Sequence, residues 1–219
     1  MSTSYKDYYK THYKSTFTKA DIDEWTRWFD SQWRIIKKNI HIKKNMRVLE
    51  IGPGFGGFYY LLRQEGVKDY IGLDLDPDIV KFTNEYFDVD VFRYQPIEEL
   101  KDTKKFDAIF AFEVLEHIEN PSEVAKKISQ LLKPGGFFCA TTPYPFKRNI
   151  VSDATHISVL HPLNWRRNLM LAGFKNVTLA PMSFAPFLWR ISKIMNVRIP
   201  AFLPIKGFVS TCLIVAKKQ

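Results

Sequence analysis

A glycine-rich run and one carboxylate give the chain the means to hold a nucleoside. The run Val48–Gly57 places Gly52, Gly54 and Gly56 directly after an apolar segment, and Asp74 follows 20 residues after Gly54. Glycine has no Cβ, so such a turn permits positive φ angles and lets a ligand lie against the backbone. A carboxylate at the end of the next strand can accept hydrogen bonds from both ribose hydroxyls.

Glu50, two residues before the first glycine, indicates which nucleoside fits. A pyrophosphate prefers positive potential, and a carboxylate beside the turn opposes it. The primary ammonium group of a methionine-like tail is instead attracted to that carboxylate. The combination therefore favours S-adenosylmethionine over a nicotinamide dinucleotide, unless Glu50 is only a charge at the end of a strand.

Two histidines are candidate proton acceptors. His117 follows an apolar run ending near Phe112, and His156 lies in a later loop. Imidazole takes up protons near neutral pH, so either residue can serve as general base for an acceptor hydroxyl, with a purely structural role as the alternative for each. We expect no metal, because His, Cys, Asp and Glu do not stand at the spacings of a metal-binding motif.

The segments that must position these residues alternate between strands and helices. Strands are predicted at Arg47–Glu50, Tyr70–Leu73, Asp90–Tyr94, Phe106–Phe110, Phe137–Thr141, Val177–Leu179 and Phe208–Ala216. Helices are predicted at Ala20–Ile40, Phe58–Gln64, Asp76–Phe87, Pro121–Leu132 and Leu163–Ala172. This alternation predicts an α/β fold with a mostly parallel sheet that helices cover on both faces.

Several of these segments resemble the motifs of class I S-adenosylmethionine-dependent methyltransferases. Val48–Gly57 resembles the first motif and Ile71–Asp74 the second, while Phe106–His117 is similar to the fourth-strand motif of the ubiquinone-type O-methyltransferases and their relatives. Leu132–Gly136 and Ala172–Phe174 are also typical of the family. The resemblance extends over about residues 46–180 and identifies the superfamily but not a substrate.

The resemblance implies a Rossmann-like, doubly wound, seven-stranded sheet whose last strand runs antiparallel. It also implies a methyltransferase domain over residues 46–219, preceded by an N-terminal helical extension over residues 1–45. An insert at residues 183–206 comes before the last strand.

The resemblance further implies which residues bind S-adenosyl-L-methionine. Glu50 and Gly52 would hold the methionine end, Asp74 the ribose, and Phe112 would face the sulfonium. The whole expected set is Glu50, Gly52, Gly54, Gly56, Asp74, Leu75, Gln95, Pro96 and Phe112. Relatives often carry Asp after the third strand to meet the adenine amino group, whereas this chain has Gln95 there, whose side-chain oxygen can take that place.

The substrate has to be inferred from the segments outside the family core. Residues 1–47 hold 11 Lys/Arg against 5 Asp/Glu, residues 48–146 hold 10 against 17, and residues 147–219 hold 11 against 1. The insert combines Phe187, Leu188 and Trp189 with basic residues, which suits a lid over an apolar substrate, a contact with an anionic membrane surface, or a helix packed on the sheet edge.

We therefore expect methylation, at oxygen, of a small molecule, a glycan or a lipid-linked precursor. The alternatives are an RNA or protein methyltransferase that uses the basic flanks, with nucleic acid the less favoured partner, and a catalytically silent cofactor-binding subunit. No run reaches the roughly 18 to 20 apolar residues that span a bilayer, and no apolar signal segment is seen at the N-terminus, so a cytoplasmic protein, or one peripheral to the membrane, is expected.

Overall fold

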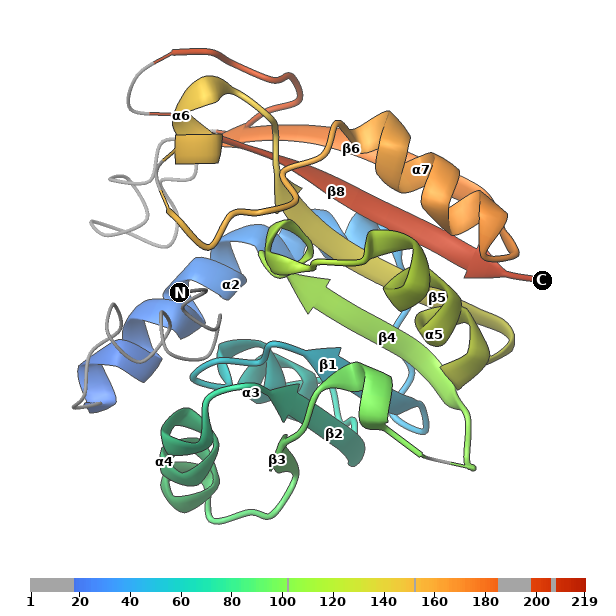
Figure 1. Ribbon diagram of the computed structural model, residues 1–219. Helices are drawn as coiled ribbons and strands as arrows, with labels where there is room; N and C mark the ends of the chain where they lie inside the picture. The colour runs from blue at the N-terminus through green and yellow to red at the C-terminus, as the bar shows by residue number, and fades with distance from the viewer. Residues whose placement is uncertain (1–17, 102, 152, 185–197, 206–207) are drawn as a thin grey trace, which may run out of the picture.

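The sheet is the central layer of the molecule and fixes where the strand ends meet. The computed structural model describes residues 18–101, 103–151, 153–184, 198–205 and 208–219. Within them the sheet has the order β3-β2-β1-β4-β5-β8-β6-β7 (Figure 1). The strands are β1 (Arg47–Ile51), β2 (Asp69–Asp74), β3 (Phe92–Tyr94), β4 (Phe106–Phe112), β5 (Leu132–Pro143), β6 (Phe174–Phe184), β7 (Arg198–Ile199) and β8 (Val209–Lys218).

The five strands from β3 to β5 are all parallel to one another. The inner strands β1 and β4 are buried along nearly their whole length, because helices cover both faces of the sheet. The strand order reverses direction between β1 and β4. The carboxyl ends of β1, β2 and β4 therefore meet at one edge, where open α/β sheets bind their ligands.

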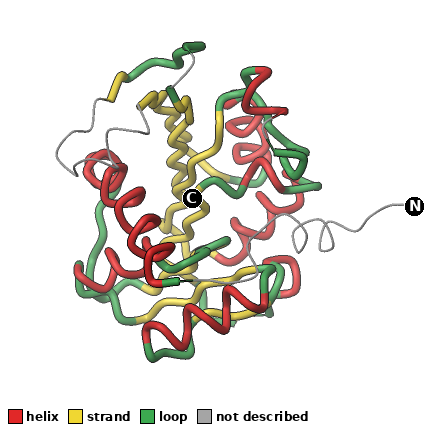
Figure 2. The backbone as a smooth tube through the Cα atoms, turned by 90° about the vertical axis from the view of Figure 1, so that its left-hand side faces the viewer, coloured by secondary structure: helices red, strands yellow, loops and turns green. Residues whose placement is uncertain are grey.

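Helices pack on both faces of the sheet, as Figure 2 shows. They are α2 (Lys19–Asn39), α3 (Gly57–Gln64), α4 (Pro77–Phe87), α5 (Pro121–Leu131), α6 (Lys147–Val151) and α7 (Pro162–Leu171), with single turns of 3-10 helix at η1 (Ile97–Glu99) and η2 (Leu115–His117). Ile128 of α5 and Trp165 of α7 belong to the core of one face, and Trp33 of α2 and Phe58 of α3 to that of the other.

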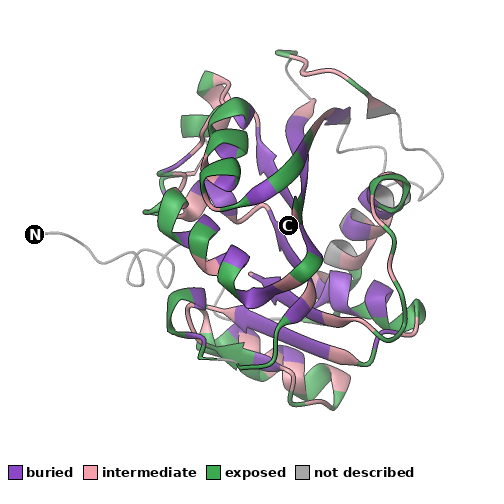
Figure 3. Cartoon of the chain, turned by 90° about the vertical axis from the view of Figure 1, so that its right-hand side faces the viewer, coloured by how far each residue is buried: buried purple, intermediate pink, exposed green. Residues whose placement is uncertain are grey.

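The longer helices bury one side and expose the other, so buried and exposed bands alternate along them in Figure 3. No helix within the described part of the chain is both long and apolar enough to cross a bilayer.

The N-terminal helix α2 is an integral part of one face rather than a separate unit. It begins after Thr18, whose backbone N–H donates to the Asp21 carboxylate over 2.8 Å in a capping arrangement. Phe29 and Trp33 of α2 then pack against the Phe58 ring, with centroids 5.9 and 5.2 Å apart. The helix α2, which is the described helical part of the extension predicted for residues 1–45, thus shares its hydrophobic core with α3.

The antiparallel strand β8 lies between β5 and β6 and pairs antiparallel with both. The predicted seven-stranded sheet with an antiparallel last strand is confirmed, and the two-residue strand β7 adds an eighth at the edge. The strand predicted at Val177–Leu179 is longer, because β6 continues along β8 as far as Phe184. Residues 185–197 of the insert, including Phe187, Leu188 and Trp189, lie outside the described residues.

Candidate active site

The turn between β1 and α3 is open on its inner side. Gly54 has a φ of +50°, and a Cβ built on it would meet no described atom within 4 Å. Gly52 has a φ of +67°, and its Cβ would lie 2.5 Å from Cγ2 of Val114. Glycine is needed at Gly52 for packing and at Gly54 for conformation, and the space over Gly54 remains available to a ligand.

The Asp74 carboxylate, at the end of β2, is tied to this turn. Its Oδ2 accepts a hydrogen bond from the Gly54 N–H over 3.1 Å, and its Oδ1 accepts one from the Asp76 N–H over 3.1 Å. Burial raises the pKa of Asp74 to about 6, although the backbone donors lower it. Asp76 in turn caps α4 by accepting from the N–H groups of Asp78 and Ile79.

A cavity of about 1040 Å³ extends from this turn along the carboxyl edge of the sheet. Nine predicted site residues line it: Gly52, Gly54, Asp74, Leu75, Gln95, Pro96, Phe112, His117 and His156. We call the part at Gly52, Gly54 and Asp74 the glycine end. The wall at Gln95 belongs to the same end, because the Gln95 N–H donates to the Asp74 carbonyl over 3.1 Å.

The Gln95 side chain leaves its oxygen able to accept a hydrogen bond. Its amide nitrogen donates to the Glu99 carbonyl over 3.1 Å, which turns the group and leaves the oxygen for another donor. Leu75, 44% exposed, and the half-buried Pro96 provide apolar surface beside it. An apolar wall with one acceptor matches the environment expected for an adenine ring and its amino group.

Glu50 lies behind the cavity rather than in its lining. The side chain is fully buried, and the Tyr70 hydroxyl donates to its Oε2. Its Oε1 has no hydrogen-bond partner among the described residues. Burial raises the pKa of Glu50 to about 8, so in this structure the group holds its proton at neutral pH. The sequence predicts a direct contact between Glu50 and the methionine ammonium group, whereas Glu50 does not line the cavity that this group would enter.

Gly56 also lies outside the cavity lining. A Cβ on Gly56 would come within 2.7 Å of the Phe87 ring, and the residue caps the N-terminus of α3 with a φ of +70°. Its role in the structure is therefore to let α3 start close to α4, whereas Gly52 and Gly54 face the cavity.

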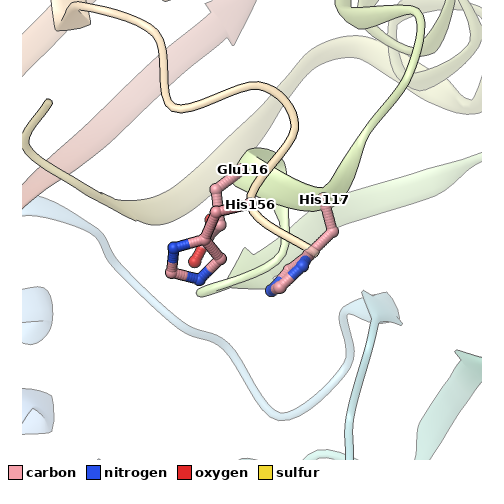
Figure 4. A group of neighbouring side chains, drawn as sticks. All are labelled: Glu116, His117 and His156. Atoms are coloured by element: carbon pink, nitrogen blue, oxygen red, sulfur yellow. The ribbon is translucent and has the colours of Figure 1, made fainter. Parts of the chain in front are cut away.

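In another part of the same cavity lining, Glu116, His117 and His156 converge, and we call this group the histidine end (Figure 4). Glu116 and His117 come from η2, directly after β4, and His156 comes from the loop between α6 and α7. The ligand-capable atoms of all three lie within 4.8 Å of one another. The two imidazole rings meet edge to face with centroids 4.9 Å apart.

Backbone groups fix the orientation of both imidazoles. His156 Nδ1 is 2.6 Å from the Asn149 carbonyl oxygen, and His117 Nδ1 is 3.1 Å from the Thr155 carbonyl oxygen. A carbonyl oxygen can only accept, so each Nδ1 carries the hydrogen and each neutral ring keeps its lone pair at Nε2. The Ser158 N–H donates to the Glu116 carbonyl over 2.8 Å and joins the loop to η2.

The cavity is strongly acidic. Its described lining residues include the carboxylates Asp21, Asp74, Glu98, Glu113, Glu116, Glu119, Glu123 and Asp153, against the single arginine Arg148. Withdrawal from water raises the pKa of Glu113 and raises that of Glu116 well above its ordinary range. Burial, together with the neighbouring His156, lowers the pKa of His117. The exposed acidic residues of the lining, Glu98, Glu119 and Glu123, rather than the buried Glu113 and Glu116, supply the negative surface that favours a cationic ligand and opposes a phosphate-rich one.

The sequence prediction did not single out Glu116, which lines the cavity beside both histidines, and it kept the two histidines as separate alternatives. The signal for Glu116 was its position immediately before His117, at the end of a strand predicted to reach the ligand edge. The contact between His117 and His156 forms because the loop between α6 and α7 folds back onto η2, and the spacing of residues in the sequence does not indicate this fold.

The fold is that of an α/β domain of the class I methyltransferase type, with the glycine end at the carboxyl edge of its parallel strands. The family model described as "Methyltransferase domain" matches residues 22–179, and the chain belongs to this family. The match begins within α2 and ends within β6. It therefore includes both the glycine end and the histidine end.

Curated relatives match the chain over part of their length. The ubiquinone biosynthesis O-methyltransferase of Xanthomonas oryzae is 34% identical over 127 residues, covering 53% of this chain and 52% of that relative. The tRNA U34 carboxymethyltransferase of Pseudoalteromonas translucida is 27% identical over 183 residues, covering 80% of this chain and 53% of that relative. The chain thus spans about half the length of these curated relatives.

A solved structure supports the fold. The S-adenosylmethionine-dependent methyltransferase of Archaeoglobus fulgidus superposes with a TM-score of 0.67 at 20% identity, covering 88% of this chain and 94% of that one. At this identity the likeness concerns the fold, and the chemistry has to be argued from the residues of this chain.

Proposed function

We propose that this protein binds S-adenosyl-L-methionine at the glycine end and transfers its methyl group to an acceptor oxygen at the histidine end. The observation that carries the proposal is the bond between the Asp74 carboxylate and the Gly54 N–H, which joins a ribose acceptor to an open backbone turn. Both groups line a cavity rich in carboxylates, which suits a positively charged cofactor.

The residues at the glycine end fit the parts of such a cofactor. The space over Gly54 admits a ligand against the backbone, and Asp74 can accept hydrogen bonds from ribose hydroxyls. Leu75, Pro96 and the Gln95 oxygen suit adenine. Phe112, at the end of β4, lines the same cavity and would face the sulfonium.

The histidine end suits the acceptor. When bound, S-adenosylmethionine supplies a methyl group on a positively charged sulfur, which an aligned nucleophile takes by in-line displacement. A hydroxyl acceptor must also lose its proton. His156 and His117 each keep an Nε2 lone pair, so either can take that proton directly.

A small molecule, a glycan or a lipid-linked precursor fits this end best as the acceptor. Acidic residues outnumber basic ones in the described lining, which opposes the entry of a polyanion, whereas hydroxyl groups of neutral compounds are tolerated. Phe29, Val114, Ile118 and Phe208 add apolar surface to the same wall, which suits an acceptor with an apolar part.

Calorimetric titration with S-adenosylmethionine tests the cofactor assignment. Asp74→Ala should weaken binding by roughly 1.5 to 3 kcal/mol, the scale of hydrogen bonds to a charged group. Asp69→Ala, at the other end of β2, is the matched control and should bind normally. Unchanged affinity in a folded Asp74→Ala variant removes Asp74 from the site.

Methyl-labelled cofactor and fractionated cell extract test the reaction. Label should enter a fraction of small molecules, glycans or lipids and should be stable to mild base, as expected of an ether-type product. Cofactor binding with no transfer to any fraction contradicts the activity and favours a binding subunit without catalysis.

RNA methylation is a second candidate, because one relative is named for tRNA and residues 147–219 carry 11 basic residues against one acidic residue. Its support would be label in RNA together with binding that weakens steeply with salt. Label in RNA that is absent from the small-molecule fractions replaces the first proposal.

A further inference from the structure

Arg148, on α6, is bonded to the stretch of backbone that leads into β8. Its Nη2 donates to the carbonyl oxygens of Leu203 and Phe208 over 3.0 and 2.8 Å, and its Nη1 donates to that of Ile205. We call residues 203–205 and 208 the strap. Three hydrogen bonds of one guanidinium group are thus directed at a segment that lies 55 to 60 residues away in the sequence.

The strap forms part of the cavity wall. Phe208 lines the cavity together with Arg148 itself. The start of the strap is anchored to the sheet, because the Leu203 N–H lies 3.1 Å from the hydroxyl oxygens of Ser183 in β6 and Ser210 in β8. Arg148 extends this anchoring to Ile205 and Phe208. The position of the apolar Phe208 side chain at the cavity wall therefore depends on Arg148.

The geometry at Arg148 requires a guanidinium and not merely a positive charge. Arginine presents five N–H donors in a rigid planar fork, whereas lysine carries a compact ammonium on a flexible stem. The Phe146 ring supports the guanidinium, with its centroid 5.5 Å from Cζ. Because both terminal nitrogens of Arg148 are bonded to the strap, we infer that it acts on a ligand through the strap.

The next residue of α6 holds the histidine end by separate contacts. The Asn149 carbonyl oxygen is 2.6 Å from His156 Nδ1. The Asn149 side chain donates to the Tyr144 carbonyl over 2.7 Å, which joins this residue to the end of β5. Loss of the Arg148 side chain should therefore release the strap and leave His156 in place.

We propose that Arg148 is a positioning residue for the acceptor. By holding the strap, it sets the apolar wall at Phe208 against which the acceptor lies, and so it limits which acceptors bind. This inference rests on the proposed function and names the residue that shapes the acceptor part of the cavity. It predicts an effect on acceptor binding that is separate from cofactor binding and from proton removal.

Hydrogen exchange of the full chain tests the contact without any acceptor. In Arg148→Ala the amides of Leu203 and Phe208 should exchange faster by about tenfold or more, as expected when hydrogen bonds to a charged group are lost. Arg148→Lys keeps the charge without the fork and should not restore protection. Arg167→Ala, at an exposed arginine of α7, should exchange there as the wild type does. Unchanged exchange in Arg148→Ala overturns the proposal.

Methyl transfer into the extract fraction that accepts label tests the consequence for the acceptor. Varying the amount of that fraction gives an apparent KM and kcat for each variant. Arg148→Ala and Arg148→Lys should each raise KM by about tenfold, on the order of one apolar side-chain contact, with kcat and cofactor affinity unchanged. A wild-type KM in Arg148→Lys means that charge alone suffices and overturns the positioning role, as does a fall in kcat at unchanged KM.

A double-mutant cycle with Phe208→Ala shows whether Arg148 acts through the wall. If it does, Arg148→Ala adds little to the KM of Phe208→Ala, because the side chain that it positions is already missing. Additive effects overturn the proposal. Absence of transfer by the wild type to every fraction overturns the proposed function and the acceptor wall with it. Transfer by the wild type with an unchanged KM in both Arg148 variants overturns this inference alone.

Discussion

The glycine end is built from backbone and one carboxylate, whereas the histidine end is built from side chains of separate segments. Gly52 and Gly54 follow β1 and Asp74 ends the adjacent strand β2, so the three lie within 23 consecutive residues, Gly52 to Asp74. His117 comes from η2, and His156 comes from the loop between α6 and α7 that returns to η2. Recognition by the backbone suits a cofactor that is the same in every reaction. Side chains on loops can be substituted in evolution to suit a different acceptor.

The comparison predicts that a substitution at one end leaves the function of the other end unchanged. The largest effect on cofactor binding should come from Gly54→Val. A valine there is strained at a φ of +50° and fills the ligand space, so cofactor binding should be lost in calorimetry. Gly135→Val is the matched control, because Gly135 also has positive φ and open space but stands near the start of β5. Near-normal affinity in Gly54→Val contradicts the placement of the glycine end.

A change at the histidine end should leave the glycine end intact. His156→Ala should lower the rate of label transfer into the responsive extract fraction by about 100-fold or more, with unchanged cofactor affinity. His41→Ala should transfer label at the wild-type rate. A rate within a few-fold of wild type would refute a catalytic role for His156, and a joint loss of cofactor affinity would show that the two ends are coupled.

The pH dependence of cofactor affinity should come from the glycine end. The pKa of Asp74 is raised to about 6, and only the carboxylate accepts from both ribose hydroxyls. Affinity is therefore present above this pKa and is lost as pH falls through it, by about tenfold between pH 7 and pH 5. Asp74→Asn supplies the reference curve for titration of the ligand itself, and an identical pH dependence in the two proteins contradicts the assignment.

Glu50→Gln should have the smallest effect on binding and a clear effect on stability. With a pKa near 8, folded Glu50 keeps a proton that the unfolded chain releases near pH 4.5, so stability falls as pH rises between these values. Glu50→Gln removes this pH-dependent loss of stability and should raise Tm more at pH 8 than at pH 5. The control Glu85→Gln, at an exposed residue, should not show this difference. A large fall in cofactor affinity would instead make Glu50 the ammonium partner.

The elements around the glycine end could be predicted because their signals are local. The strand before Gly52, the helix that starts at Asp76-Pro77 and the carboxylate at Asp74 all follow from residue type and neighbouring sequence. Each was found within a few residues of its expected position, because the capping side chain and the proline act on the backbone beside them.

The positions of Glu50 and His156 could not be predicted, because they depend on contacts between segments that are distant in the sequence. Both faces of β1 are buried, so the alternation of its side chains does not reveal which face looks toward the ligand. The α6 turn, which was not predicted, carries the Asn149 carbonyl that holds His156. Such contacts exist only once distant segments are packed.

The place of β8 within the sheet has a consequence for synthesis on the ribosome. β6 pairs with β8 and not with β5, although the ribosome makes β6 before β8. Until Val209–Lys218 has emerged, β5 presents an unpaired edge and β6 has no partner in the main sheet. The parallel half of the sheet can therefore form early. Completion of the sheet waits for β8, which is made about 65 residues after β5. During this interval another nascent chain can pair with the same open edge.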